Sequence, residues 1–241
     1  MVALLWQEVR DVLTVPAYAT NSLTGMIVFP LMLCLALFSS GETGGLQEIK
    51  KMLAMVPSGA YLAVVTGILG LMGSMCMAAS TAVSREGKCH ELRKTYPVSG
   101  AVQLRAKVYM GMVFNVIGMV VMVIILCVVL PEFWTETLLA ALCALPLAFL
   151  LSITSVIVDA HFPKLNWKTE IEAVKQNMNA MIGMLLSMVL IALLVGAFVL
   201  LMKWGMGWTV SLAVAVAFAL LLDVLAILWL NHFAANSYLA H

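Results

Sequence analysis

The side chains able to do covalent chemistry are few and scattered along this sequence. The four histidines do not cluster. Asp159 and His161 together supply only two of the three or four ligands that a metal site requires. The phosphate-binding pattern GxxxxGK[ST] is absent from the sequence, so we expect ATP to be hydrolysed in another chain. The sequence therefore predicts no catalytic residue, no metal site and no cofactor bound by this chain.

Two polar side chains fall inside long apolar runs. Asp223 lies seven residues before Leu230, where its run ends, which places it about 10 Å inside at a rise of 1.5 Å per residue. Because a carboxyl group in a bilayer is costly, it is a candidate functional group. A structural hydrogen bond and a role in an ion or proton pathway both explain it. Asn115 is a weaker candidate of the same kind.

The densest group of charges is the segment 84–99, which reads SREGKCHELRKTYPVS. Gly87 permits a break in a helix, and Lys88–Thr95 is long enough for about two helical turns. Pro97 ends that helix because the residue before a proline disfavours the α conformation. Ser99 is a suitable N-cap for the next helix. A short charged helix between two long ones suits mechanical contact with a partner; a solvated loop beside the membrane is the plain alternative.

A second charged segment contains a helix-start pattern. Thr169 and Glu172 match the capping box S/T-x-x-E. Glu170 and Glu172 fall in the first turn, where the helix dipole favours negative charge. We expect an amphipathic turn over 170–179, in which Glu170, Glu172 and Lys175 form a second candidate cytosolic contact. Capping of a helix at the membrane surface explains the same pattern.

The elements that position these residues follow from composition. The chain has 241 residues, of which 63% are hydrophobic and 10% charged, whereas soluble domains have about 25% charged residues. Its continuous apolar runs of about 20 residues suit helices that cross a bilayer. We predict an all-α polytopic membrane protein with six transmembrane helices, over about 17–38, 58–83, 108–130, 136–158, 180–202 and 208–230. A polar loop over 39–51 follows the first span, the second span continues as a helix beyond the membrane to about Glu86, and 231–241 form a short polar tail.

Residues 1–15 form a separate element in this prediction. The apolar residues Val2, Leu5 and Val9 recur at helical spacing, and Glu8 and Asp11 lie on the opposite face. A short amphipathic helix of this kind lies in the membrane interface rather than crossing it. We expect Pro16 then to redirect the chain into the bilayer. We therefore divide the chain into this interfacial helix and a transmembrane domain over 16–241.

The distribution of basic residues predicts the orientation. Ten of the 13 lysines and arginines fall in the N-terminal helix and in the charged connections over 84–107 and 159–179, and the other three fall on the opposite side of the predicted spans. Loops rich in Lys and Arg stay in the cytosol. We expect a multi-pass protein of the cytoplasmic membrane with both termini cytosolic. The formal net charge of +1 gives no reason to expect a nucleic-acid partner.

Two of these segments resemble a known family. The pattern SREGK…LRKTYPVSGAVQLRAK resembles the segment between the second and third spans of type-2 ABC exporter permeases. In that family this segment is the coupling helix, which docks on the ATPase subunit. The segment 159–177 resembles the loop between the fourth and fifth spans in a Gram-positive bacterial branch. The whole chain resembles the second half of a longer permease of that branch.

The resemblance implies a membrane subunit of an ABC exporter. ATP and Mg²⁺ would bind to a separate ATP-binding cassette ATPase subunit, and a second six-span permease unit, identical or homologous, would complete the pathway among the membrane lipids. The residues that match the coupling segment are Arg85, Glu86, Lys88, Glu91, Leu92, Arg93, Lys94, Tyr96 and Pro97. The transported substrate has no signature in the sequence.

Two other functions compete with this interpretation. An ion-coupled secondary transporter would use an intramembrane acid such as Asp223, although the internal repeats and broken helices typical of that class are not evident. An intramembrane enzyme that modifies lipids or cleaves peptides would need clustered acids or histidines. Asp159, His161 and Asp223 are its only candidates.

Overall fold

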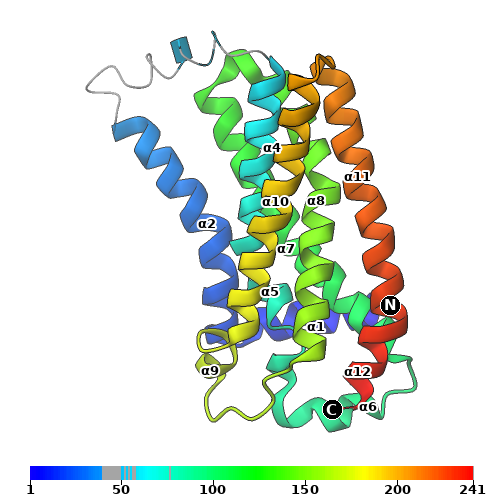
Figure 1. Cartoon of the computed structure of the whole chain (residues 1–241). Coiled ribbons are helices and arrows are strands. Elements are labelled where there is room, and N and C mark those ends of the chain that lie inside the picture. Colours follow the sequence, from blue (N-terminus) through cyan, green and yellow to red (C-terminus); the bar gives the residue numbers. More distant parts are fainter. Residues whose placement is uncertain (40–49, 52, 54, 56–57, 76, 241) are drawn as a thin grey trace.

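The structure is a bundle of long, roughly parallel helices (Figure 1). It is a computed structural model that describes residues 1–39, 50–51, 53, 55, 58–75 and 77–240. Every described element is helical. Both termini lie at the same end of the bundle, which we call the terminal end; the opposite end is the far end (Figure 1). The predicted loop over 39–51 lies almost wholly outside the described residues.

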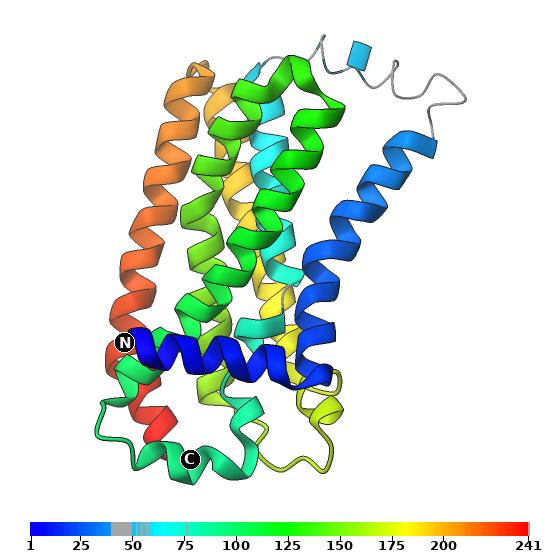
Figure 2. The same ribbon diagram turned by 180° about the vertical axis from the view of Figure 1, so that it is seen from behind.

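The N-terminal helix crosses the terminal end of the bundle. Helix α1 (Val2–Thr14) is followed by Val15 in an extended conformation, as expected before a proline. Helix α2 (Pro16–Ser39) then runs at 95° to α1 and leans away from the bundle toward the far end (Figure 2). The sequence predicted both the separate helix and the turn at Pro16.

The two faces of α1 differ from a simple apolar-in, polar-out pattern. Glu8 and Val12 are buried against the bundle, whereas Val2 and Trp6 are exposed. Outward-facing apolar side chains of this kind suit a helix that lies on a lipid surface. The inward position of Glu8 means that a carboxylate is held inside the protein and needs a partner there.

Four of the six predicted spans correspond to helices that are long and apolar enough to cross a bilayer, counted over the described residues. They contain α7 (Gly100–Val129), α8 (Trp134–His161), α10 (Met178–Lys203) and α11 (Trp208–Trp229). A fifth is added if α1 and α2 are taken together as one bent span. The prediction of membrane-spanning helices is thus confirmed for four spans, while six spans stay a prediction.

The described part of the predicted second span is helical as far as Ser80. Helix α4 (Ser58–Met75) and helix α5 (Met77–Ser80) follow one another along the bundle. The sequence predicted that this helix continues to about Glu86, which is wrong: a turn occupies 81–83, and the 3₁₀ helix η2 (Ser84–Cys89) follows.

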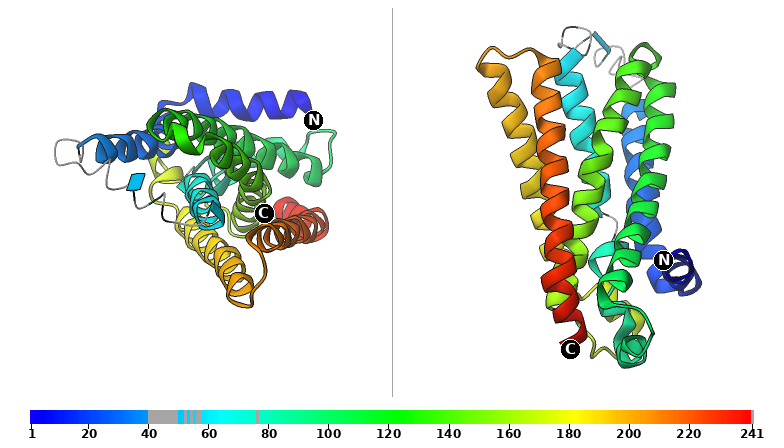
Figure 3. Two further views of the ribbon diagram at one scale, coloured as in Figure 1. Left: turned by 90° about the horizontal axis from the view of Figure 1, so that it is seen from above. Right: turned by 90° about the vertical axis from the view of Figure 1, so that its right-hand side faces the viewer.

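Helix α8 lies at the centre of the packing, in contact with α4, α7, α10 and α11. Seen from above, α2 and α11 lie at opposite edges of the bundle (Figure 3). One apolar cluster, which includes Leu104 and Ile153, fills the terminal half. Another, which includes Leu69 and Met122, fills the far half. The core therefore runs along the whole bundle.

The C-terminal segment was predicted to be a short polar tail, and this is wrong. The chain remains helical through a π-helical turn, η4 (Leu230–Ala234), and helix α12 (Ala235–Ala240). Leu230, Ala234 and Tyr238 are fully buried, and α12 packs against α7 and α8. Apolar residues at intervals of four give this segment a buried face.

The second charged segment forms a shorter helix than expected. Helix α9 (Glu170–Val174) ends before the predicted limit, and α10 starts anew with Asn177 as its N-cap, which accepts a hydrogen bond from the Asn179 amide at 3.0 Å. Thr169 is the N-cap of α9, but its side chain makes no cap hydrogen bond. The predicted capping box is therefore not formed. Glu172 instead accepts a hydrogen bond from the Lys168 amide.

Candidate functional site

The candidate site is the charged connection between α5 and α7 at the terminal end. We call residues 84–94 the elbow; it consists of η2 and helix α6 (His90–Lys94). Gly87, at φ +49° and ψ −127°, divides it at the position where the sequence predicted a break. Helix α6 is shorter than the two turns predicted over Lys88–Thr95.

The two charged segments of the sequence pack together here. A Cβ atom at Gly87 would lie 2.5 Å from Cζ2 of Trp167, so the indole ring lies directly against the elbow backbone. The Trp167 indole N–H also donates to the Ser84 carbonyl oxygen at 2.9 Å. The loop after α8 thus supports the elbow.

Asp159 anchors the beginning of the elbow. Its carboxylate, which is fully buried in the last turns of α8, accepts hydrogen bonds from the amides of Val83 at 2.6 Å and Ser84 at 2.9 Å. The Ser84 hydroxyl and the Asn179 side-chain amide, at 2.8 Å, donate to its other oxygen. Asp159 therefore fixes the elbow to α8 and to the start of α10.

A larger group of polar side chains holds the inner face of the elbow. It joins α1, η2, α6, α7 and α12, and we call it the elbow network. Its members are Glu8, Asp11, Glu86, His90, Arg93, Gln103, Lys107 and Tyr238.

Lys107 is the central cation of the elbow network. Its ammonium nitrogen lies 2.8 Å from Oε1 of Glu8 and 2.7 Å from Oε1 of Glu86. It also donates to the Ala82 carbonyl oxygen at 3.1 Å. Lys107 was expected in the charged segment outside the membrane, which is wrong: it belongs to α7, and only 1% of it is exposed.

Arg93 connects α6 to α1. Its guanidinium group pairs with Glu8 and lies 2.5 Å from Oδ2 of Asp11. Burial by itself lowers the pKa of Arg93, but the neighbouring carboxylates outweigh it and raise the pKa. Arg93 is therefore a permanent cation turned toward the protein.

Glu86 is ionised in this environment. Burial raises the pKa of Glu86, but the Lys107 ammonium and the hydrogen bond from His90 lower it to about 2. Because a buried carboxylate is stable only with partners, the elbow depends on these cations.

Tyr238 brings the C-terminal helix into the elbow network. Its hydroxyl lies 3.2 Å from both carboxylate oxygens of Glu86 and 3.0 Å from Oε1 of Gln103. His90 lies between the same two residues, with Nδ1 at 2.6 Å from Oε2 of Glu86 and Nε2 at 3.1 Å from the Tyr238 carbonyl oxygen. Helix α12 is thus attached to the elbow at two points.

The outer face of the elbow carries fewer residues than the resemblance implied. Four of the predicted docking residues are exposed, namely Lys88, Glu91, Leu92 and Pro97. The other five lie partly or wholly within the protein: Arg85, Glu86, Arg93, Lys94 and Tyr96. Leu92 is 63% exposed.

The half-buried members of this set have internal contacts. The Arg85 guanidinium lies 5.5 Å from the centroid of the Tyr18 ring and donates to the Ala78 carbonyl oxygen. The Tyr96 hydroxyl accepts a hydrogen bond from the side-chain amide of Gln7 at 3.4 Å. Sequence reasoning therefore identified the elbow but not which of its side chains face outward.

The second predicted contact lies beside the elbow. Helix α9 packs against η2, and Glu170 and Lys175 are exposed next to it. Glu172 is half-buried. The two loops together form one surface at the terminal end, which the sequence could not establish because it did not place the loops side by side.

Asp223 and Asn115 lie in different helices, α11 and α7. The side-chain amide of Asn115 donates to the Ser152 hydroxyl at 2.9 Å. The Oδ1 atoms of Asn115 and Asp223 are buried, and no described residue forms a hydrogen bond with either. The structural hydrogen bond that would explain Asp223 is therefore not found at Oδ1.

Among the described residues, no three His, Cys, Asp or Glu side chains gather closely enough to hold a metal ion.

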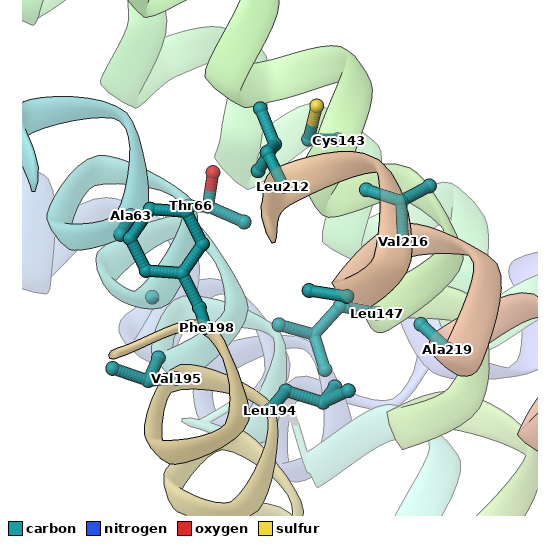
Figure 4. A pocket seen from close by; sticks show the side chains of 12 residues that line it. Ala63, Thr66, Cys143, Leu147, Leu194, Val195, Phe198, Leu212, Val216 and Ala219 are labelled. Carbon is teal, nitrogen blue, oxygen red and sulfur yellow. The ribbon is translucent and has the colours of Figure 1, made fainter. Parts of the chain in front are cut away.

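An apolar cavity of about 40 Å³ lies between α4, α8, α10 and α11, with Thr66, Leu147 and Phe198 in its wall (Figure 4). Sites for drug-sized ligands occupy roughly 300 Å³ or more. This cavity is thus too small for such a ligand.

Sequence reasoning missed several members of the elbow network, including Glu8, Lys107 and Tyr238. The sequence carries a weak signal for Lys107, which directly precedes a long apolar run. If the helix begins before this residue, its charged side chain lies on the helix at the membrane border and needs a partner. The partner itself carries no such signal, since Glu8 is 99 positions away.

No known protein family, curated protein or solved structure matches this chain.

Proposed function

We propose that this chain is a membrane permease subunit of an ABC exporter and that a separate ATPase subunit supplies the energy for transport. One observation carries the proposal: the elbow has two faces with different roles. Lys88, Glu91 and Leu92 point away from the bundle, where a partner can reach them. The opposite face is held by buried charges.

The buried face makes the elbow suitable for transmitting force. Lys107 ties it to α7, Asp159 ties it to α8, and Tyr238 ties it to α12. A push on the exposed face therefore moves several long helices together instead of deforming a loop. Rigid-body motion between two packed states is the expected mode of transport.

The proposed assembly contains two permease units and two ATPase subunits in the cytoplasmic membrane. The second permease unit is either identical to this chain or homologous to it. The terminal end faces the cytosol, because most lysines and arginines lie there in the predicted topology. ATP and Mg²⁺ bind to the ATPase subunits.

Variants of the exposed face test this proposal. Leu92→Asp and Lys88→Glu change side chains that face outward and belong to no internal ion pair of the described residues. We expect at least a tenfold loss of an ATP-binding cassette ATPase from the same genome on co-purification. Lys203→Glu, at the exposed far end, is the control and should retain the partner. Full retention of the ATPase by both elbow variants would refute the docking assignment.

Charge reversal at Arg93 is not a suitable test of docking. Arg93 pairs with Glu8 and Asp11 inside the protein, so its reversal would damage the attachment of α1 as well. Loss of a partner in that variant would not separate the two causes.

The second candidate function is ion-coupled secondary transport. Asp223 favours it, because this acid is 6% exposed within a membrane-spanning helix and its Oδ1 has no described hydrogen-bond partner. In that case a proton gradient drives transport without ATP, and Asp223→Asn abolishes it. An intramembrane enzyme has less support, since the carboxylate of Asp159 is fully engaged in holding the elbow.

A further inference from the structure

His90 has an unusual pair of neighbours. Its Nδ1 atom lies 2.6 Å from the Glu86 carboxylate, and its Nε2 atom lies 3.1 Å from the Tyr238 carbonyl oxygen. Carboxylate and carbonyl oxygens only accept hydrogen bonds, whereas a neutral imidazole has a single N–H donor. Both contacts are hydrogen bonds only if both ring nitrogens carry a proton.

The immediate contacts of His90 favour the same state. His90 is 1% exposed and lies in the elbow network. The buried carboxylates of this network, Glu8 and Glu86, are matched by Lys107 and Arg93, whereas the Asp11 side chain is 44% exposed. A buried charge is stable when it is paired and hydrogen-bonded. A protonated His90 meets both conditions, because it pairs with Glu86 and donates to the Tyr238 carbonyl oxygen.

We propose that His90 is an imidazolium that latches helix α12 to the elbow, and that loss of one proton releases the latch. In the neutral ring, one nitrogen presents a lone pair to an oxygen lone pair. One of the two bonds is then lost, and the attachment of the Tyr238 backbone to the elbow weakens. The proton belongs to the latched state, so the latch is present at low pH and is lost as pH rises.

The other charged groups around His90 do not act as this switch. Glu86 is ionised because its pKa is about 2, and the raised pKa of Arg93 keeps it charged. The Tyr238 hydroxyl and the Lys107 ammonium also face Glu86. Imidazole is the only side-chain type in this network that ordinarily titrates between about pH 5 and 8.

The latch is a property of this chain alone and does not rest on the proposed exporter function. Its consequence for the chain is that protonation controls how firmly α12 holds the elbow. An exporter in which the elbow docks on a motor would then be regulated by cytosolic pH, but a latch without any docking partner is equally testable.

The protonation state is measured directly by ¹⁵N NMR of the histidine-labelled protein in lipid nanodiscs, with His90→Gln to assign the signal. We expect both ring nitrogens of His90 to be protonated at pH 7. A neutral tautomer of His90 at pH 7 would overturn the assignment. This readout needs no functional assay and uses the wild-type protein.

Release of α12 is measured by spin-label distances. Cys89 and Asn236→Cys are both exposed and carry the labels, with the other four cysteines replaced by alanine. We expect one narrow distance distribution at pH 6 and a second, longer population at pH 9. His90→Gln should show the longer population at both values, and His232→Gln should behave like the wild type. A distribution that stays narrow from pH 6 to pH 9 would overturn the release, whether or not His90 keeps its proton.

Discussion

The ammonium nitrogen of Lys107 lies 2.7 Å from Oε1 of Glu86, and the side chains of both residues are only 1% exposed. This pair joins α7 to the elbow across the terminal end of the bundle. A buried ion pair contributes little net stability compared with apolar packing, but removing one partner leaves an uncompensated charge. Removal of either partner of this pair should therefore strongly destabilise the attachment of the elbow.

The first prediction concerns Lys107→Met. We expect a loss of about 3–5 kcal/mol in unfolding free energy, because Glu8 and Glu86 lose their shared cation. Denaturant titration of the purified protein in mixed micelles measures this change. The matched control is Lys50→Met, which breaks the solvent-exposed pair with Glu132 and should cost far less stability. Equal losses in the two variants would contradict a special role for Lys107.

The second prediction concerns acid pH. The folded-state pKa of Glu86 is about 2, below the ordinary value of 4.5, so its contribution to stability is complete above about pH 4.5 and is lost as pH falls toward 2. Glu86→Gln should be less stable at neutral pH and should lose less stability than the wild type between these values. Thermal unfolding across this range gives the difference. Glu170→Gln, on the exposed helix α9, should follow the wild-type profile.

The third prediction uses three glycines. Gly87→Ala places a Cβ atom at positive φ and within 2.5 Å of the Trp167 ring, so it should destabilise the protein by more than the roughly 1–2 kcal/mol of backbone strain alone. Gly205→Ala, at φ +83° with nothing within 4 Å, should show only the strain. Gly196→Ala, in open space on α10, should be neutral or stabilising. When the three variants are measured side by side, the melting temperature should be lowest for Gly87→Ala, intermediate for Gly205→Ala and highest for Gly196→Ala. A Gly87→Ala variant as stable as Gly205→Ala would show that the Trp167 ring moves aside without cost.

The fourth prediction concerns Asp159→Asn. The amide keeps the shape of the carboxylate but brings an NH₂ group toward the Ser84 and Val83 donors, so at least one buried donor loses its acceptor. We expect a cost of roughly 1–3 kcal/mol. Hydrogen exchange should become faster over 81–84 and at the start of α10. Glu136→Gln, near the far end, should leave exchange in both segments unchanged. Unaltered protection at Val83 and Ser84 in Asp159→Asn would contradict the anchor.

Much of the helical layout could be predicted from the sequence, because hydropathy is a local property. An apolar run of about 20 residues can bury itself only in a bilayer or in a large core, and it must be helical in the bilayer. Four of the predicted spans match such helices. Pro16 and Gly87 also act locally, since each restricts or permits backbone angles whatever surrounds it. The break in the elbow and the turn after α1 were therefore readable in advance.

The identity of the buried charges could be decided only by the tertiary structure. Glu8 and Lys107 are 99 positions apart, and Tyr238 and Glu86 are 152 positions apart. Whether a charged side chain at a membrane border faces water or a partner depends on the rotation and packing of helices, and the sequence pattern around it is the same in both cases. The sequence alone thus determined which segments are helices and where charge accumulates. The packing of those helices decided which charges are structural and which remain on the surface, because pairing energy is realised only when distant residues meet away from water.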